Sequence, residues 1–284
     1  MFPNAFLIGA QKSGTTYLAA LLAQHPDVCF SKSKELHFFE RKRNRKKGLA
    51  FYESCFEPYD NQRIVMEATP GYMIFDHALE DIYRTLGNEI KILVILRDPV
   101  NRLISQYRMR LSVGGERRSL DEAVGFLLDS GFVNYKNYVH RGLYYEQLKM
   151  VEKYFLRENI HISVFEDFIK NPEKGISEVC RFLGIDDSFA FDFNTKRNPG
   201  RKNSPNFLGR MFSLLPRKIR YRILSSMTNE GKGRFFRFIS SKNKEMNHGD
   251  ISEENMKRLR ELYKPQKDML EETYGLDLSS WKNI

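Results

Sequence analysis

The spacing of hydrophobic residues near the start of the chain changes at a short glycine-rich loop. Residues 5–8 (Ala-Phe-Leu-Ile) are continuously apolar, which predicts a buried strand. Beyond the loop, apolar side chains recur at helical spacing from Tyr17 to Leu22, and this pattern ends at His25-Pro26. The chain is therefore predicted to begin with a strand, a loop and a helix.

Further apolar runs predict strands at residues 63–67, 90–96 and 160–165. The run at 90–96 is apolar enough to be buried on both faces of a parallel sheet. Helical patterns occupy the intervening and following segments, at residues 76–86, 99–112, 119–129, 142–157 and 172–184. This alternation predicts an α/β fold, a doubly wound parallel sheet with helices on both faces.

The pattern changes again in the last third of the chain. Residues 193–250 are basic and rich in Asn and Ser, and we interpret them as an excursion over the active face. Helical spacing returns from Ser252 to Tyr274, and the segment 276–281 is predicted to pack back onto the sheet. Because a chain of this length is compatible with one large core, we expect a single domain over residues 1–284.

Composition narrows the class of partner and the compartment. A formal net charge of +10 favours anionic partners, such as nucleotides, sulfated or carboxylated glycans, nucleic acid or acidic membranes. No stretch reaches the roughly 20 apolar residues that cross a bilayer, and the first residues carry no signal-peptide pattern. The three cysteines, Cys29, Cys55 and Cys180, fit neither a disulfide framework nor a metal site. We therefore expect no metal, no transmembrane segment and a cytoplasmic location.

The loop at residues 9–16 (Gly-Ala-Gln-Lys-Ser-Gly-Thr-Thr) has the residue types that bind phosphate or sulfate. Its glycines let backbone N–H groups turn toward an anion, and the N-terminus of the following helix adds partial positive charge. Lys12 supplies a full positive charge, and Ser13, Thr15 and Thr16 supply hydroxyl donors. These features predict a P-loop nucleotide-hydrolase-like site; the structural alternative is a glycine turn with a solvated lysine.

A second candidate anion site follows the run at 90–96. Arg97 stands at the carboxyl end of that strand, where ligands of open α/β sheets bind. Ser105 lies two helical turns further on, so it reaches the same phosphate only if the connection folds back. By itself the pattern also fits a local Arg97–Asp98 ion pair and an exposed Ser105.

Glu35 and His37 are the candidate catalytic residues, within the segment 34–40 (Lys-Glu-Leu-His-Phe-Phe-Glu). If the segment is extended, side chains two residues apart lie on one face. Either group can accept a proton from an acceptor hydroxyl. The structural alternative is a surface glutamate beside a hydrogen-bonded core histidine.

The two anchors together resemble those of the sulfotransferases that use 3′-phosphoadenosine 5′-phosphosulfate (PAPS). The resemblance rests on Lys12-Ser13-Gly14-Thr15-Thr16 and on Arg97-Asp98-Pro99 with Ser105. It extends to residues 165–168 and 276–281, which are similar to bacterial members of the family. The resemblance implies that the first loop binds the 5′-phosphosulfate, through Lys12, Ser13, Gly14, Thr15 and Thr16. It also implies that Arg97 and Ser105 bind the 3′-phosphate.

The segment that carries Glu35 is similar to one in the glycosaminoglycan sulfotransferases, whose matching glutamate is the general base. The resemblance therefore implies Glu35 as the base, His37 in support or in its place, and Lys12 at the leaving group. Two departures from those enzymes are present. They carry a lysine in the motif that matches residues 67–72, where this chain has Ala68, and they carry a cysteine pair near a C-terminal loop that this chain lacks.

Two basic stretches complete the predicted site. Residues 41–47 (Arg-Lys-Arg-Asn-Arg-Lys-Lys) follow the catalytic candidates directly, and they either steer an anionic acceptor into the cleft or form a solvated face. Residues 196–202 correspond in order to the family's loop that closes over the nucleotide. Arg201 and Lys202 are the candidate nucleotide contacts within them.

The sequence thus predicts an enzyme that transfers a sulfuryl group from PAPS to an acceptor hydroxyl on a carbohydrate, without a nucleic-acid partner. The first alternative is a P-loop nucleotide kinase or triphosphatase with Asp98 as metal ligand. In such loops the lysine follows the second glycine, where this chain has Thr15. The second alternative is a polyanion-binding module with an inactive loop, which predicts binding with a steep salt dependence and no product.

Overall fold

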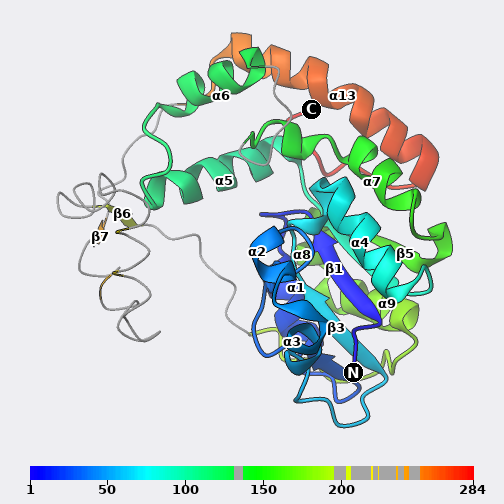
Figure 1. Ribbon diagram of the computed structural model, residues 1–284. Coiled ribbons are helices and arrows are strands. Elements are labelled where there is room, and N and C mark those ends of the chain that lie inside the picture. Colours follow the sequence, from blue (N-terminus) through cyan, green and yellow to red (C-terminus); the bar gives the residue numbers. More distant parts are fainter. Residues whose placement is uncertain are drawn as a thin grey trace.

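The computed structural model describes residues 1–130, 137–194 and 250–284, together with 203–205, 219, 223, 235 and 240–242. Within this part of the chain, five parallel strands form one sheet in the order β2-β3-β1-β4-β5 (Figure 1). The strands are β1 Ala5–Gly9, β2 Val28–Phe30, β3 Ile64–Ala68, β4 Lys91–Leu96 and β5 Ile160–Val164. A separate antiparallel pair joins β6 Asn203–Pro205 and β7 Ser240–Lys242.

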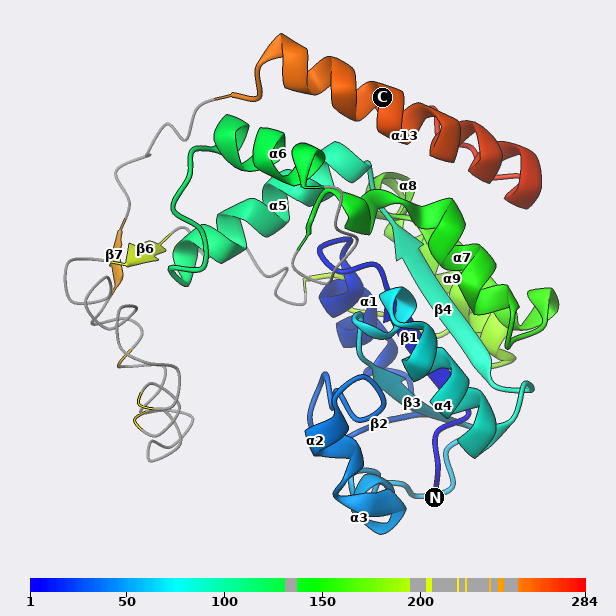
Figure 2. The ribbon, with the colours of Figure 1, turned by 45° about the horizontal axis from the view of Figure 1, so that its top comes forward.

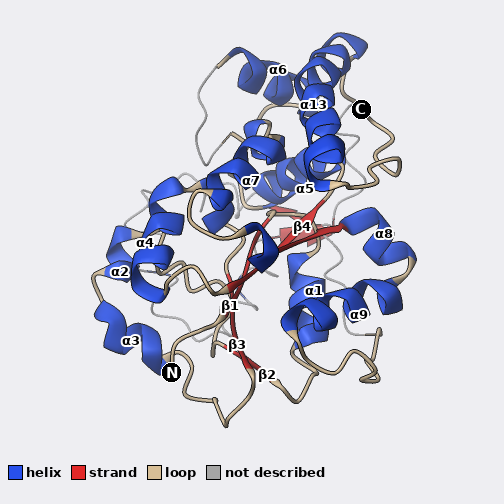
Figure 3. Cartoon of the chain, turned by 90° about the vertical axis from the view of Figure 1, so that its right-hand side faces the viewer, coloured by secondary structure: helices blue, strands red, loops and turns tan. Residues whose placement is uncertain are grey.

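Helices cover both faces of the sheet, which confirms the predicted layering (Figure 3). Along β1, Ala5 and Leu7 belong to one apolar layer and Phe6 and Ile8 to the other, because successive strand side chains point to opposite faces. The first layer contains α1 Thr15–Leu22, α8 Phe165–Lys170 and α9 Pro172–Leu183. The second contains α3 Gly48–Ser54, α4 Asp76–Leu86 and α7 Tyr144–Glu152.

A further apolar cluster joins three helices beyond the carboxyl end of β4 (Figure 2). These are α5 Pro99–Ser112, α6 Leu120–Asp129 and α13 Glu253–Tyr274. α13 continues through Pro265, so the two helical patterns predicted after Ser252 form one element. Leu278 and Trp281 return to the layer of α4 and α7, which confirms that the end of the chain packs back onto the sheet.

The parallel order brings the carboxyl ends of β3, β1 and β4 to one edge of the sheet. In register, Leu7 of β1 lies between Ala68 of β3 and Leu93 of β4. The loops that follow these strands therefore start side by side, at the edge where open α/β sheets bind their ligands. Among the residues described, no helix combines the length and the apolar character needed to cross a membrane. The single-domain division of residues 1–284 stays a prediction.

Candidate active site

The glycine-rich loop connects β1 to α1 and turns tightly at Gly14, the residue before the helix. Gly14 has φ 92°, a conformation that L side chains rarely adopt. A Cβ atom on it would lie 2.5 Å from the ring of Phe165, so both the backbone and the packing require glycine. Ser13 and Thr15 are buried beneath the loop. The loop thus presents its backbone and Lys12 at the N-terminus of α1, an arrangement suited to an anion.

Arg97 directly follows β4 and meets the loop, as the sequence predicted. Its Nη1 donates a hydrogen bond to the carbonyl oxygen of Lys12 at 3.1 Å. Its guanidinium lies 4.8 Å from the centre of the Phe165 ring, the ring that also packs against Gly14. The Phe165 ring therefore packs against both Gly14 of the loop and the side chain of Arg97.

Ser105 lies on α5, one turn after Arg102. The Arg102 side chain is fully buried, and its guanidinium donates to Gln106 at 2.5 Å and to the carbonyl of Gln11 in the loop at 3.5 Å. Because residues three apart on a helix are neighbours, Ser105 belongs to the part of α5 that adjoins the loop. Its contact with a 3′-phosphate stays a prediction.

Asp98 caps helix α5 and also contacts Asn283 near the end of the chain. It is fully buried, and its Oδ1 caps α5 by accepting the N–H groups of Val100 at 2.9 Å and Asn101 at 3.0 Å. Its Oδ2 accepts the backbone and side-chain N–H groups of Asn283 at 3.2 and 2.7 Å. Both carboxylate oxygens are engaged within the protein, so Asp98 is unsuited to the metal-ligand role of the kinase alternative.

Glu35 and His37 lie in the segment after β2, beside the carboxyl end of β3. The Glu35 N–H donates to the carbonyl of Ala68 at 3.0 Å. The backbone is not extended as predicted, because φ is 61° at Glu35 and 51° at His37. The side chains nevertheless meet: His37 Nε2 is 3.6 Å from Glu35 Oε2, and His37 Nδ1 is 2.5 Å from Glu40 Oε1. Non-glycine residues at positive φ are strained and are common at functional sites.

Lys12 and Glu35 share one electrostatic environment, although they come from different loops. Burial lowers the pKa of Lys12, the charge of Arg97 lowers it further, and Glu35 opposes both. Lys34, next to Glu35, donates a hydrogen bond to the hydroxyl of Thr16 at the start of α1. A carboxylate thus stands beside the cations of the phosphate loop, which places a proton acceptor next to an anion site.

A buried carboxylate, Glu67 of β3, supports the segment that carries the candidate base. Its oxygens accept hydrogen bonds from the hydroxyls of Tyr52 at 2.5 Å, Thr69 at 2.6 Å and Tyr72 at 2.7 Å. The same hydroxyl of Tyr72 accepts the N–H of Phe38 at 3.0 Å. Burial raises the pKa of Glu67, against the effect of these hydrogen bonds. The motif at residues 67–72 was visible in the sequence, but the hydroxyl network was not.

Arg141 also contacts the loop; residues 141–144 resemble a family segment in which a Tyr or Arg lies near the donor or acceptor, and a structural helix start is the alternative. The Nη1 of Arg141 donates to the side-chain oxygen of Gln11 in the loop at 2.7 Å. Burial, followed by the charge of Arg102, lowers its pKa to about 10. Together with Lys12, Arg97 and the buried Arg102, Arg141 makes the surroundings of the loop strongly cationic.

The two predicted nucleotide contacts in the basic loop are not among these site residues. Arg201 and Lys202 lie outside the residues that the structure describes, so their contact with a nucleotide stays a prediction.

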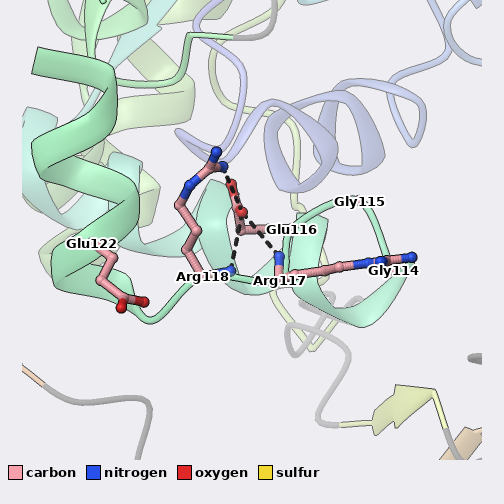
Figure 4. Close-up of a pocket in the computed structure, with 6 residues that line it drawn as sticks. All are labelled: Gly114, Gly115, Glu116, Arg117, Arg118 and Glu122. Carbon is pink, nitrogen blue, oxygen red and sulfur yellow. Dashed lines mark hydrogen bonds and ion pairs between the residues drawn. The ribbon is translucent and has the colours of Figure 1, made fainter. Parts of the chain in front are cut away.

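A surface hollow of about 650 Å³ lies at the far end of α5 (Figure 4). It is lined by Gly114, Gly115, Glu116, Arg117, Arg118 and Glu122. Because the 14 residues of α5 span about 21 Å, this hollow is remote from the loop.

No group of three or more His, Cys, Asp or Glu side chains in the described part of the chain is arranged to hold a metal ion. Cys29, Cys55 and Cys180 are all free and buried.

The chain is similar to sulfotransferases over most of its length. A family model described as "Sulfotransferase domain" matches residues 2–269. Heparan sulfate glucosamine 3-O-sulfotransferase 5 of Mus musculus is 33% identical over 188 residues, which cover 64% of this chain and 54% of that protein. Heparan sulfate glucosamine 3-O-sulfotransferase 3B1 of Homo sapiens is 29% identical over 270 residues, 93% of this chain and 61% of that protein. The chain thus spans about half to three fifths of the length of these relatives.

The fold has a counterpart among solved structures. The crystal structure of a sulfotransferase from Alicyclobacillus acidocaldarius matches with a TM-score of 0.72 at 23% sequence identity, over 99% of both chains. This likeness confirms the predicted fold class, a P-loop nucleotide-hydrolase-like α/β sheet. Because the family model also covers nearly the whole sequence, the chain belongs to the sulfotransferase domain family.

Proposed function

We propose that this protein transfers a sulfuryl group from PAPS to a hydroxyl group of a carbohydrate acceptor. The observation that carries the proposal is the position of the Glu35 carboxylate next to the loop: Lys34 lies 3.9 Å from Glu35 Oε1 and donates a hydrogen bond to the hydroxyl of Thr16. Family membership supports the reaction type, and the departure of the loop lysine from the nucleotide-triphosphatase order supports a donor other than ATP.

The donor occupies the edge of the sheet formed by β1 and β4. Loop residues Lys12, Ser13, Gly14, Thr15 and Thr16 bind its 5′-phosphosulfate, and Arg97 with Ser105 binds its 3′-phosphate. Arg201 and Lys202 add contacts to the nucleotide. Such an arrangement acts through positioning and charge stabilisation, as in phosphoryl transfer.

Glu35 is the general base in this proposal. As the acceptor oxygen attacks sulfur, Glu35 takes the hydroxyl proton, and Lys12 stabilises the charge that develops on the leaving 5′-phosphate. His37 lies between Glu35 and Glu40, 3.6 and 2.5 Å from their oxygens, so it orients the base, and it is the alternative base if Glu35 does not accept the proton. The transfer proceeds by in-line displacement without a metal ion.

A carbohydrate acceptor is supported by the two relatives, whose names assign them to heparan sulfate glucosamine. The basic stretch at residues 41–47 follows the base directly and suits a negatively charged sugar chain. Part of this stretch is structural, since Arg45 in α2 Lys42–Arg45 pairs with Asp81 at 2.5 Å and stacks over Phe38. Arg41 is 56% exposed and lies next to the candidate base segment, although its Nε is 3.5 Å from Glu40 Oε1. A cytoplasmic location stays a prediction from the sequence.

The proposal is tested by measuring transfer of radiolabelled sulfate from PAPS across acceptor classes. These comprise sulfated and unsulfated polysaccharides, lipid-linked sugars, small hydroxyl compounds and tyrosine peptides, with Lys12→Ala as the donor-site control. Thermal shift with 3′-phosphoadenosine 5′-phosphate (PAP) and with ADP provides an independent measurement. A preference for PAP of at least ~1.4 kcal/mol, tenfold in affinity, is expected. Equal binding of ADP with a Mg²⁺ requirement would instead favour the kinase alternative, and polyanion binding without product would favour the binding module.

A further inference from the structure

Lys34 is a second lysine at the phosphate loop, supplied by a different part of the chain. Its Nζ donates a hydrogen bond to the hydroxyl of Thr16, and it lies 3.9 Å from Glu35 Oε1. The side chain is 30% exposed, so most of it is covered. It therefore reaches across from the segment after β2 to the N-terminus of α1.

The charges of Lys34 and Lys12 act on each other. Burial lowers the pKa of Lys34, Glu35 raises it, and the positive charge of Lys12 lowers it further. Burial and the charge of Arg97 likewise lower the pKa of Lys12, and Glu35 is the only one of its main influences that raises it. Lys34 thus contacts both the candidate base and the hydroxyl of Thr16, and its charge acts on Lys12. An anion bound at the N-terminus of α1 would offset the repulsion between the two lysines.

Lys34 also adjoins residue 68, where the glycosaminoglycan sulfotransferases carry a lysine and this chain carries Ala68. The N–H of Glu35, the next residue, donates to the Ala68 carbonyl at 3.0 Å. A side chain from position 34 and one from position 68 therefore start from neighbouring backbone at the carboxyl end of β3. The Ala68 side chain is buried in the apolar layer of α1, whereas Lys34 contacts Thr16 at the start of that helix.

We propose that Lys34 is a catalytic residue that binds the phosphosulfate of the donor together with Lys12, on the side of the base. This inference rests on the proposed function. In the transfer step the acceptor oxygen forms a bond to sulfur, and the bond between sulfur and the bridging oxygen breaks. The electron pair of the broken bond stays on the 5′-phosphate of PAP, and the hydroxyl proton passes to Glu35. Lys34 stabilises the negative charge that accumulates on the departing phosphate.

The test replaces Lys34 with methionine, which keeps the length of the side chain and removes its charge. Removal of one such stabilising group lowers kcat by roughly 100-fold in comparable sites, and we expect a loss of at least about tenfold here because Lys12 remains. Binding is measured by calorimetry with PAP and with adenosine 3′-monophosphate, which lacks the 5′ group. We expect Lys34→Met to weaken PAP binding and to leave binding of adenosine 3′-monophosphate unchanged, whereas a general structural defect weakens both.

A control variant sharpens the result. Lys32→Met is the matched control, because Lys32 lies two residues away and pairs with Glu57 on the surface; its kcat and PAP affinity should equal those of the wild type.

The outcomes separate this inference from the proposed function. If the wild type neither binds PAP nor forms a sulfated product, the proposed function fails and the inference fails with it. If the wild type is active and Lys34→Met keeps kcat and PAP affinity within about twofold, the role of Lys34 alone is wrong. A loss of binding to both nucleotides in Lys34→Met would also refute it, because the effect would then not concern the 5′ end.

Discussion

The hydroxyl of Tyr72 links the buried carboxylate of Glu67 to the backbone that carries the candidate base. It donates to Glu67 Oε1 at 2.7 Å and accepts the N–H groups of Phe38 at 3.0 Å and Phe39 at 3.4 Å. Tyr72→Phe removes this hydroxyl and keeps the ring. A hydrogen bond to a charged group contributes about 1.5–3 kcal/mol, and a buried group left without a partner costs about 1–3 kcal/mol. We therefore expect the free energy of unfolding to fall by about 3 kcal/mol.

Urea unfolding at neutral pH measures this change, with Tyr52→Phe as the control. Tyr52 also donates to Glu67, at 2.5 Å, whereas the backbone N–H of Phe38 donates to the hydroxyl of Tyr72. Tyr52→Phe should therefore cost less than Tyr72→Phe, and only Tyr72→Phe should also lower kcat by displacing the segment of Glu35. A loss below about 1 kcal/mol for Tyr72→Phe, or equal losses of activity in both variants, would refute the reasoning.

Further predictions concern the base, the loop and the pH dependence of stability. Glu35→Gln should lower kcat by roughly 100-fold or more, while PAP affinity, measured by calorimetry, stays within about threefold of the wild-type value. Full turnover with normal donor binding would show that the base is another group. Gly14→Ala should weaken PAP binding and lower the free energy of unfolding in urea by about 1–3 kcal/mol, because the new Cβ would meet Phe165 and because φ is 92° at this position. Wild-type values for both measurements would contradict the packing argument. Because burial raises the pKa of Glu67 above 4.5, the folded state binds this proton more tightly than the unfolded chain. The resulting stability is fully present below pH 4.5 and is lost as pH rises through the folded-state pKa, so Glu67→Gln should flatten this decline in urea unfolding. Parallel pH profiles for the two proteins would show that Glu67 does not titrate as inferred.

The strand and helix pattern of the first 190 residues was largely predictable. The runs at 63–67, 90–96 and 160–165 became β3, β4 and β5, because continuous apolar sequence is stable only when buried in the sheet. The edge strand β2 was missed, since three residues are too few to show a pattern.

The candidate site was predictable only where one short segment contains all the information. Gly14 and Lys12 were recognisable because a loop that binds an anion at a helix N-terminus needs glycine and positive charge within a few residues. Asp98 caps α5 through a local contact of its Oδ1, but its Oδ2 accepts from Asn283, 185 residues away, and that contact could not be inferred from the sequence around either residue. The same applies to the hydroxyls of Tyr52 and Tyr72, which meet on Glu67 from different elements.

By itself, the sequence determined the alternation of strands and helices and the presence of a phosphate loop, because hydrophobic period and glycine conformation are local properties. Tertiary structure decided which residues share the site. The strand order places β3 and β4 on either side of β1, so the segment with Lys34 and Glu35, bonded to the end of β3, reaches the loop that Arg97 approaches from β4. Strand order follows from packing between distant segments, and no local pattern encodes it.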